Sequence, residues 1–294
     1  MKTNSDKSIK KIRLRYEEGF FKGVMFLSNY LIAFLLGLII YTILKTGVPS
    51  LTWEMITETP KGGFYFGKEG GILNAIIGSL YLALGSTLLA FVIGLPVALY
   101  MNTWMIHKRN AVNAVRFVLD LLWGIPSIVY GAFGFTLMMV LGLKASLIAG
   151  ILVVALLILP IMIRGIDEGL KTIPRGLQEA SYSLGSTKSE MAFLVMMRQS
   201  LPCIITAILL SFGRAMGDAA AVLFTTGFTD NIPTSLLQPT ATLPLAIFFQ
   251  LSSPIPEVKA RAYAAAVILT IIILIISLLS RFFTYRYAKH SIKF

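Results

Sequence analysis

The stretch 145–163 reads ASLIAGILVVALLILPIMI, with no charged residue between Lys144 and Arg164. A helical run of this length matches the thickness of the hydrocarbon core of a membrane. The whole chain shares this character: 56% of its 294 residues are hydrophobic, 14% are charged, and the mean hydropathy is +0.79. Soluble domains carry about 25% charged residues. The sequence therefore predicts an all-α integral membrane protein, because its apolar runs are continuous and too long for the strands of a membrane barrel.

Six windows of about 20 mostly apolar residues are candidate transmembrane helices. They lie at 21–44, 75–100, 117–141, 145–163, 204–226 and 264–282. Gly124 and Pro126 fall inside the third window and predict a kink or a break there. The expected organisation is a basic segment at 1–20, a first helix with an external loop at 21–74, and a transmembrane core at 75–294.

The net charge of +12 follows the predicted topology. Most of the 26 basic residues lie in the N-terminal segment, the second and fourth loops and the C-terminus, all on one side of the membrane. By the positive-inside rule, both termini and the fourth loop are cytoplasmic. The topology accounts for the charge, so no nucleic-acid partner is predicted. The basic and apolar segment 8–20 fits a cytoplasmic anchor or, alternatively, an interfacial helix lying on membrane lipid.

No cofactor or metal ion is predicted to bind this chain. Cys203 is the single cysteine, which excludes an internal disulfide and a cysteine-based zinc site, and His107 and His290 are isolated. The stretch 62–69, GGFYFGKE, imitates a phosphate-binding loop. It has Glu69 where the magnesium-binding Ser or Thr would stand, and no strand precedes it, so ATP binding there is rejected.

The stretch 211–224, SFGRAMGDAAAVLF, places two charged residues inside an apolar predicted helix. Each such residue costs about 2.5 to 3.5 kcal/mol at mid-bilayer on the translocon scale, so a chain rarely carries two without a use. Arg214 and Asp218 are four apart and would share one helical face. Gly213 and Gly217 would let a neighbouring helix approach closely. The pattern predicts a polar path for a solute; alternatively, the two charges only neutralise each other.

The fourth predicted loop, 164–201, is long and has helical periodicity. Pro174 stands at a favoured first-turn position, and Gly185 ends the first apolar face. A second face begins after Ser189. Two short helices joined by a glycine turn form a knob that fits a groove on a partner. The alternative is a surface hairpin without a partner.

Within this loop, the stretch 179–185, EASYSLG, resembles the glutamate-alanine-alanine-x-x-x-glycine motif of permeases from binding-protein-dependent ABC importers. Ser181 replaces the second alanine, and Met197-Arg198 stands where Leu-Pro is usual. Three further stretches, GIPSIVYG at 124–131, LPIMIR at 159–164 and GRAMGD at 213–218, resemble the A-type permease subunit of phosphate-specific importers. The resemblance extends from about residue 70 to the C-terminus. Asp218 departs from the glutamate usual in that family.

The resemblance implies a type I importer permease in a bacterial inner membrane, itself non-catalytic. A paralogous permease subunit would complete the pathway, and an external phosphate-binding protein would deliver the solute. A dimer of ATPase subunits, which use ATP and Mg²⁺, would dock on the coupling loop through Glu179, Ala180 and Gly185.

The chemistry of phosphate assigns further expected roles. Arg214 would bind phosphate oxygens through its planar guanidinium. Asp218 would hold Arg214 and keep its affinity low enough for release. Ser127, beside Pro126, would offer a hydroxyl where the backbone is interrupted. The alternatives are a permease for another oxyanion such as molybdate or sulfate, and an ATP-independent carrier or membrane scaffold.

Overall fold

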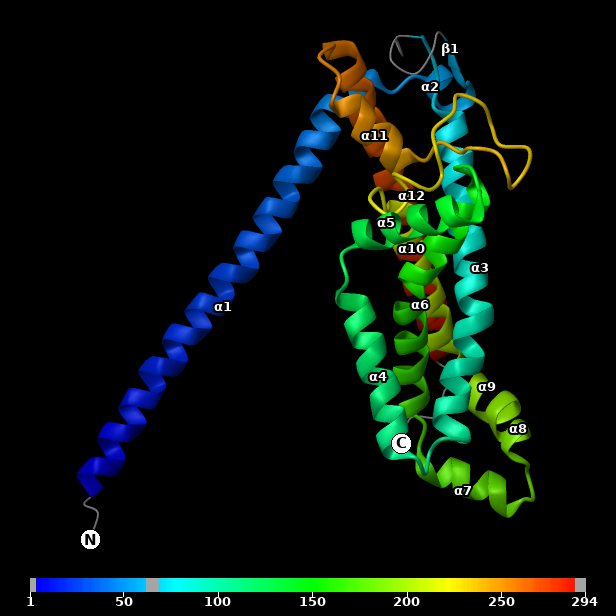
Figure 1. Ribbon diagram of the computed structural model, residues 1–294. Coiled ribbons are helices and arrows are strands. Elements are labelled where there is room, and N and C mark those ends of the chain that lie inside the picture. Colours follow the sequence, from blue (N-terminus) through cyan, green and yellow to red (C-terminus); the bar gives the residue numbers. More distant parts are fainter. Residues whose placement is uncertain (1–3, 62–68, 289–294) are drawn as a thin grey trace.

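The computed structural model describes residues 4–61 and 69–288 and is almost entirely helical (Figure 1). The first elements are α1 (Asn4–Gly47), the 3₁₀ turn η1 (Val48–Ser50), α2 (Trp53–Thr57), the strands β1 (Pro60–Lys61) and β2 (Glu69–Gly70), and α3 (Leu73–Thr103). Next come α4 (Arg109–Gly124), α5 (Ser127–Leu141), α6 (Leu147–Lys171), α7 (Arg175–Ser183), α8 (Lys188–Glu190), the π-helical η2 (Met191–Met196) and α9 (Met197–Gln199). The last are α10 (Leu201–Gly217), α11 (Leu243–Leu251) and α12 (Pro256–Ala288). The stretch 62–68, most of the phosphate-loop-like sequence, lies outside the described residues.

Four helices, α1, α3, α6 and α12, are long and apolar enough to cross a membrane. Two more crossings arise if each bent pair counts as one span: α4 with α5, and the helix 188–199 with α10. The predicted all-α membrane fold with about six crossings is therefore confirmed. Helix α1 runs from Asn4 without a break at residue 20, so segment 8–20 continues the first helix.

The third span is broken, as Gly124 and Pro126 predict. Helices α4 and α5 meet at 94°. Pro126 has no N–H to donate, and its ring forces the preceding Ile125 into an extended conformation with φ −71° and ψ 129°. The break gives α5 a direction of its own, nearly across that of α4 (Figure 1).

The fifth span ends earlier than expected. The prediction of one helix over 204–226 is wrong, because α10 stops at Gly217 and Asp218 is extended, with φ −84° and ψ 122°. The carboxylate of Asp218 accepts a hydrogen bond from the Ala221 N–H at 2.9 Å. Such a local side-chain contact gives the backbone an alternative to the helix. Residues 218–242 form turns and extended segments up to α11.

The first residues of the predicted loop 164–201 belong to α6, which continues past Ile163 to Lys171. The hairpin then occupies 172–200. The last turns of α6 carry four charged residues that pair at three- and four-residue spacing: Arg164, Asp167, Glu168 and Lys171. Such pairs support a helix where the apolar run has ended.

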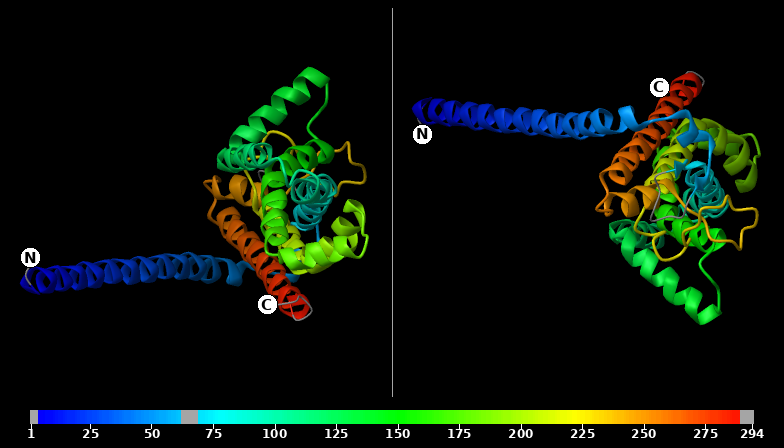
Figure 2. Two further views of the ribbon diagram at one scale, coloured as in Figure 1. Left: turned by 90° about the horizontal axis from the view of Figure 1, so that it is seen from below. Right: turned by 90° about the horizontal axis from the view of Figure 1, so that it is seen from above.

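Helix α6 is the centre of the bundle and packs mainly against α3 and α10. Nearly three quarters of its most apolar window is buried, whereas none of the corresponding window of α1 is. Helix α1 contacts the bundle only near its end, where Gly47 lies against Tyr263 and Val267 of α12, and it otherwise stands apart (Figures 1 and 2). The start of α1, the end of α12 and the hairpin α7–α9 lie toward one end of the molecule (Figure 1).

Helix α5 lies directly on the irregular segment that follows α10. A Cβ atom at Gly131 would be 2.8 Å from the Ala220 carbonyl oxygen and 2.9 Å from that of Ala221. One at Gly134 would be 2.2 Å from Val153. The missing side chain at Gly131 therefore lets α5 cover backbone that has left the helix, and the one at Gly134 lets α5 lie close to α6.

We expect Gly131→Ala to lower the free energy of unfolding by about 1–3 kcal/mol, because its methyl group meets backbone oxygens that cannot rotate away. Thermal unfolding of the purified protein in detergent measures the effect. Gly37→Ala is the matched control, since nothing lies within 4 Å of a Cβ at Gly37 of α1. Equal melting temperatures for the two variants would contradict this close packing.

Candidate functional site

Arg214 and Asp218 lie together at the end of α10. The Arg214 Nη2 is 3.1 Å from the Asp218 Oδ2; the Asp218 side chain is 2% exposed, and the Arg214 side chain is 47% exposed. The expectation that both stand in one helix is wrong, because Asp218 follows the last helical residue. The ion pair forms nevertheless. Arg214 also lies in the last turn of α10, where a cation is favoured by the helix dipole.

The two oxygens of Asp218 have different partners. Oδ1 accepts the Ala221 N–H, whereas Oδ2 is buried without a hydrogen bond among the described residues. Its 3.1 Å distance from Arg214 is therefore an electrostatic contact whose angle is not that of a hydrogen bond. The Asp218 carboxylate is held by a backbone N–H, whereas the Arg214 guanidinium is half exposed, so its N–H donors remain available.

The glycines beside this pair are uncovered within the described chain. Nothing lies within 4 Å of a Cβ position at Gly213, and Gly217 reaches only a methyl group of Ile273, at 3.9 Å. No described helix of this chain uses the two glycines for close packing. Close approach of a neighbouring helix at this face stays a prediction.

Ser127 is the first residue of α5 and is partly buried. It lies one turn before Gly131, on the same face of the helix. Gly131 packs on Ala220 and Ala221, so this face of α5 and the segment after Asp218 belong to one region. No hydrogen bond joins Ser127 to Arg214 or Asp218 in the part of the chain that the structure describes.

The predicted cytoplasmic knob is a helical hairpin. Helix α7 begins after Pro174, and Gly185 turns the chain with φ +83°, a conformation that other residues rarely adopt. Thr187 then starts α8 with a capping box: its hydroxyl accepts the Glu190 N–H, and the Glu190 carboxylate accepts the Thr187 N–H.

The outer face of this hairpin is open. Glu179 and Ala180 are exposed, and Leu184, at the tip, is 89% exposed. Ser181, which departs from the usual alanine, is partly buried. Its hydroxyl lies 2.7 Å from the hydroxyl of Ser186, and Ser186 also donates to the Ser181 carbonyl oxygen. The departure thus adds a hydrogen bond that ties α7 to the glycine turn.

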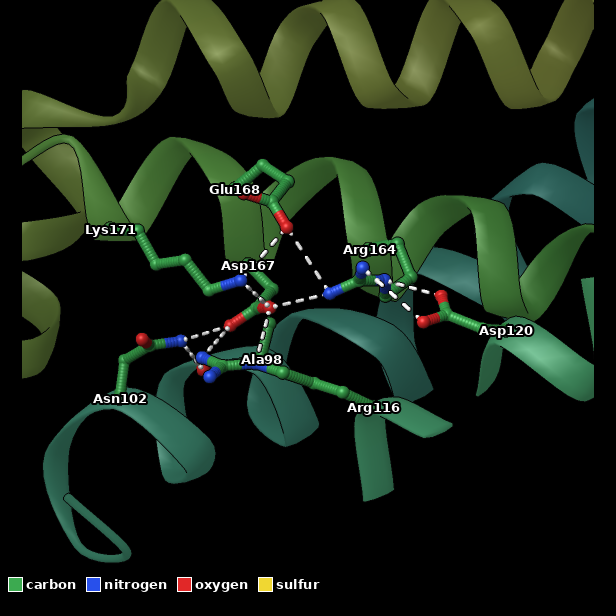
Figure 3. A network of polar contacts seen from close by, with 8 residues as sticks. All are labelled: Ala98, Asn102, Arg116, Asp120, Arg164, Asp167, Glu168 and Lys171. Atoms are coloured by element: carbon green, nitrogen blue, oxygen red, sulfur yellow. Dashed lines mark hydrogen bonds and ion pairs between the residues drawn. The ribbon is translucent and has the colours of Figure 1, made fainter. Parts of the chain in front are cut away.

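A second group of charges, at the end of α6 that leads into the hairpin, was not identified from the sequence (Figure 3). Asp167 is 0% exposed and accepts from Arg116 of α4 at 2.9 Å and from Asn102 of α3 at 2.8 Å. Arg164 and Lys171 lie at 3.2 and 3.1 Å from the same carboxylate. The signal in the sequence was the run of charges at helical spacing after an apolar span.

The described residues offer no group of three or more His, Cys, Asp or Glu side chains that could hold a metal ion. Cys203 packs against Gly169, where a Cβ would be 2.3 Å from the Cys203 Cβ. Its thiol therefore fills a contact between α10 and α6.

We expect Asp218→Ala to lower the free energy of unfolding by about 1–2 kcal/mol, because it leaves the Ala221 N–H without its acceptor. Asp218→Asn retains an oxygen at that position and should cost less than half as much, since Arg214 is half exposed and its pair contributes little. Thermal unfolding in detergent compares the two. If the asparagine variant is as unstable as the alanine variant, the charge and not the backbone contact anchors this residue.

Comparison with known proteins identifies the family. Residues 90–291 match the family described as "Binding-protein-dependent transport system inner membrane component". The phosphate transport system permease protein PstA of Xylella fastidiosa is 34% identical over 244 residues, 82% of this chain and 83% of that protein. PstA of Haemophilus influenzae is 30% identical over 262 residues, 89% and 91% of the two chains.

Solved structures show the same fold at lower identity. A chain of the inward-facing MetNI methionine ABC transporter superposes with a TM-score of 0.59 at 19% identity, covering 73% of this chain and 95% of that one. A bacterial alginate ABC transporter chain also gives 0.59, at 15% identity, covering 97% and 99%. The chain therefore belongs to the inner membrane components of binding-protein-dependent transport systems, which are multi-pass ABC importer permeases.

Proposed function

We propose that this chain is a permease subunit of an ATP-driven phosphate importer. Curated relatives that are 30–34% identical over most of their length are named for phosphate transport. The observation that carries the proposal is Arg214, a cation at the end of a membrane helix that is neutralised by one neighbour and left half open. The uncovered face beside it supports a pathway lined jointly with a second permease subunit.

Hydrogen phosphate is strongly hydrated, so it crosses hydrocarbon only if protein groups replace its water. The guanidinium of Arg214 stays charged and can donate two parallel hydrogen bonds to phosphate oxygens. Asp218 keeps an opposing charge 3.1 Å away, which limits the attraction so that phosphate can leave. Ser127 adds a hydroxyl from the start of α5, where the helix break leaves the first N–H groups of α5 unpaired by the helix.

The hairpin 172–200 is the docking element for the ATPase. Its exposed Glu179, Ala180 and Leu184 form a contact surface, and Gly185 supplies the turn. ATP and Mg²⁺ are bound by that separate subunit, which is present as a dimer, and this chain performs no catalysis. The hairpin, the start of α1 and the end of α12 share one end of the molecule, which we assign to the cytoplasm (Figure 1). An external phosphate-binding protein delivers solute to the other end.

Replacing Arg214 tests the solute and the pathway together. In cells that lack other phosphate importers, we expect Arg214→Gln to lower high-affinity phosphate uptake at least tenfold, because glutamine offers no charge. Arg281→Gln, an exposed arginine of α12, is the control and should leave uptake within twofold. Uptake by Arg214→Gln equal to that of the unaltered protein removes Arg214 from the pathway. Competition by molybdate or sulfate at the same concentration as phosphate would favour another oxyanion.

Gly185 tests the docking of the ATPase. We expect Gly185→Val to reduce co-purification of the ATPase at least tenfold, because valine strains at φ +83°. Gly185→Asn should retain most binding, since asparagine tolerates this conformation and nothing within 4 Å obstructs a side chain. Glu179→Ala should also weaken capture. If all three variants retain the ATPase, the hairpin is not its docking site, and an ATP-independent carrier or scaffold becomes the better reading.

A further inference from the structure

Helix α4 meets the rest of the bundle through a few apolar side chains, with Val115 partly buried beside the core, and through ion pairs to α6. Only Val112 and Leu119 of its 16 residues are buried apolar side chains. Between the α4–α5 elbow and α6 there is a cavity of about 370 Å³ with a nearly all-apolar lining. It is lined by Leu119, Leu122, Ile125, Tyr130, Leu156 and Pro160, among others. Where α4 approaches the break, this cavity separates it from α6, and the ion pairs of Arg116 and Asp120 join the two helices.

Two ion pairs cross from α4 to α6 at successive turns (Figure 3). In the inner pair, Arg116 donates through Nε and Nη2 to both oxygens of Asp167, at 2.9 Å each. In the outer pair, Arg164 Nε lies 2.8 Å from Asp120 Oδ1. The helical spacing of Arg116 and Asp120 does not produce a pair between them, because each binds a residue of α6 instead.

The carboxylate of the inner pair is fully buried and has several donors, whereas the carboxylate of the outer pair is half exposed on the surface of the chain. Asp167 is 0% exposed and also accepts a hydrogen bond from the Asn102 amide. The same amide donates to the Ala98 carbonyl oxygen of α3. A buried carboxylate with such partners cannot lose one of them without leaving a charge uncompensated. Asp120 is 49% exposed, so its pair with Arg164 can open at lower cost.

This network lies between the hairpin and the Arg214 region. Lys171, which pairs with Asp167, is the last residue of α6, and α7 begins four residues later at Arg175. On the other side, α4 leads into α5, whose Gly131 rests on the carbonyl groups of Ala220 and Ala221. Contacts thus run without interruption from the hairpin, through α6 and α4, to the backbone beside Asp218.

We propose that the ion pairs Arg116–Asp167 and Arg164–Asp120 clamp α4 to the end of α6, so that α4 and the coupling hairpin move as one body. The four residues are positioning residues: they contact no solute and transmit the movement of the hairpin to α5. This inference rests on the proposed function, in which an ATPase moves the hairpin. The test therefore measures the coupling itself.

The chain supplies a matched pair of variants for this test. Asp120 and Glu168 are half-exposed acids, at 49% and 58%, and both pair with Arg164, at 2.8 and 3.1 Å. Only Asp120 belongs to another helix, since Glu168 pairs within α6. Asp120→Asn and Glu168→Gln therefore make the same chemical change to the same arginine, but only the first removes a link between helices.

The complete transporter, reconstituted in liposomes with its binding protein, gives the ratio of phosphate moved to ATP hydrolysed. We expect Asp120→Asn to lower this ratio at least threefold while ATP hydrolysis stays within twofold. Glu168→Gln should leave the ratio unchanged. An equal effect of the two variants, or a proportional loss of uptake and hydrolysis, overturns the clamp and leaves a purely structural network.

The inner pair is tested by a double variant that removes both charges, because Asp167→Asn alone leaves the partly buried Arg116 without its acidic partner and can prevent folding. The double variant Arg116→Gln, Asp167→Asn should lower the ratio of phosphate moved to ATP hydrolysed at least tenfold. The single variant Arg116→Lys keeps the charge and should retain part of the ratio of the unaltered transporter. A ratio equal to that of the unaltered transporter in the double variant contradicts the clamp.

Spin labels give a reading that does not depend on the solute. Cysteines at Val118 of α4 and Gly176 of α7, in a Cys203→Ser background, occupy sites that are exposed or without neighbours within 4 Å. In the complex, the mean distance between the two labels should stay constant when ATP binds. The distribution of distances should broaden in Asp120→Asn but not in Glu168→Gln. A distance that changes with ATP while the network is intact overturns the proposal. Constant distances with no phosphate uptake would instead refute the proposed solute.

Discussion

A backbone inside a membrane must satisfy its own hydrogen bonds, and the architecture around Arg214 follows from that constraint. Helix α10 ends at Gly217, and the irregular segment that follows is tolerated because protein covers it. Asp218 caps the Ala221 N–H, and the glycine face of α5 lies over the freed backbone. The break in the third span supplies the required direction of α5. The two interrupted spans therefore support each other, and together they place a charged pair at a helix end.

The two charge clusters of the protein differ in how completely they are satisfied. Asp167 is surrounded by donors from three helices and has no exposed surface, which suits the proposed clamp between α4 and α6. Arg214 has one acidic neighbour and keeps nearly half of its side chain open, which suits a transient anion. In the proposed mechanism, the degree to which hydrogen bonds are satisfied, more than the presence of charge, separates the clamp from the anion site.

The departures from the family pattern have local consequences. Ser181 replaces an alanine, and its hydroxyl bonds to Ser186 across the glycine turn, so the hairpin gains an internal tie without losing its exposed outer face. Asp218 stands where the resemblance leads one to expect glutamate. Its short side chain reaches the N–H three residues ahead, a contact typical of aspartate in turns. The same fold occurs in chains of the methionine and alginate ABC transporters at 15–19% identity.

The sequence by itself determined the membrane class, the apolar spans, the break at Pro126 and the glycine turn of the hairpin, because each depends on local hydrophobicity or backbone restriction. Only the tertiary structure decided where α10 ends and that Asp120 and Arg116 bind α6 instead of each other. Helical spacing shows which residues share a face of a helix. The partner of a charge depends on which opposite charge another helix brings within reach, because an unpaired charge away from water is costly.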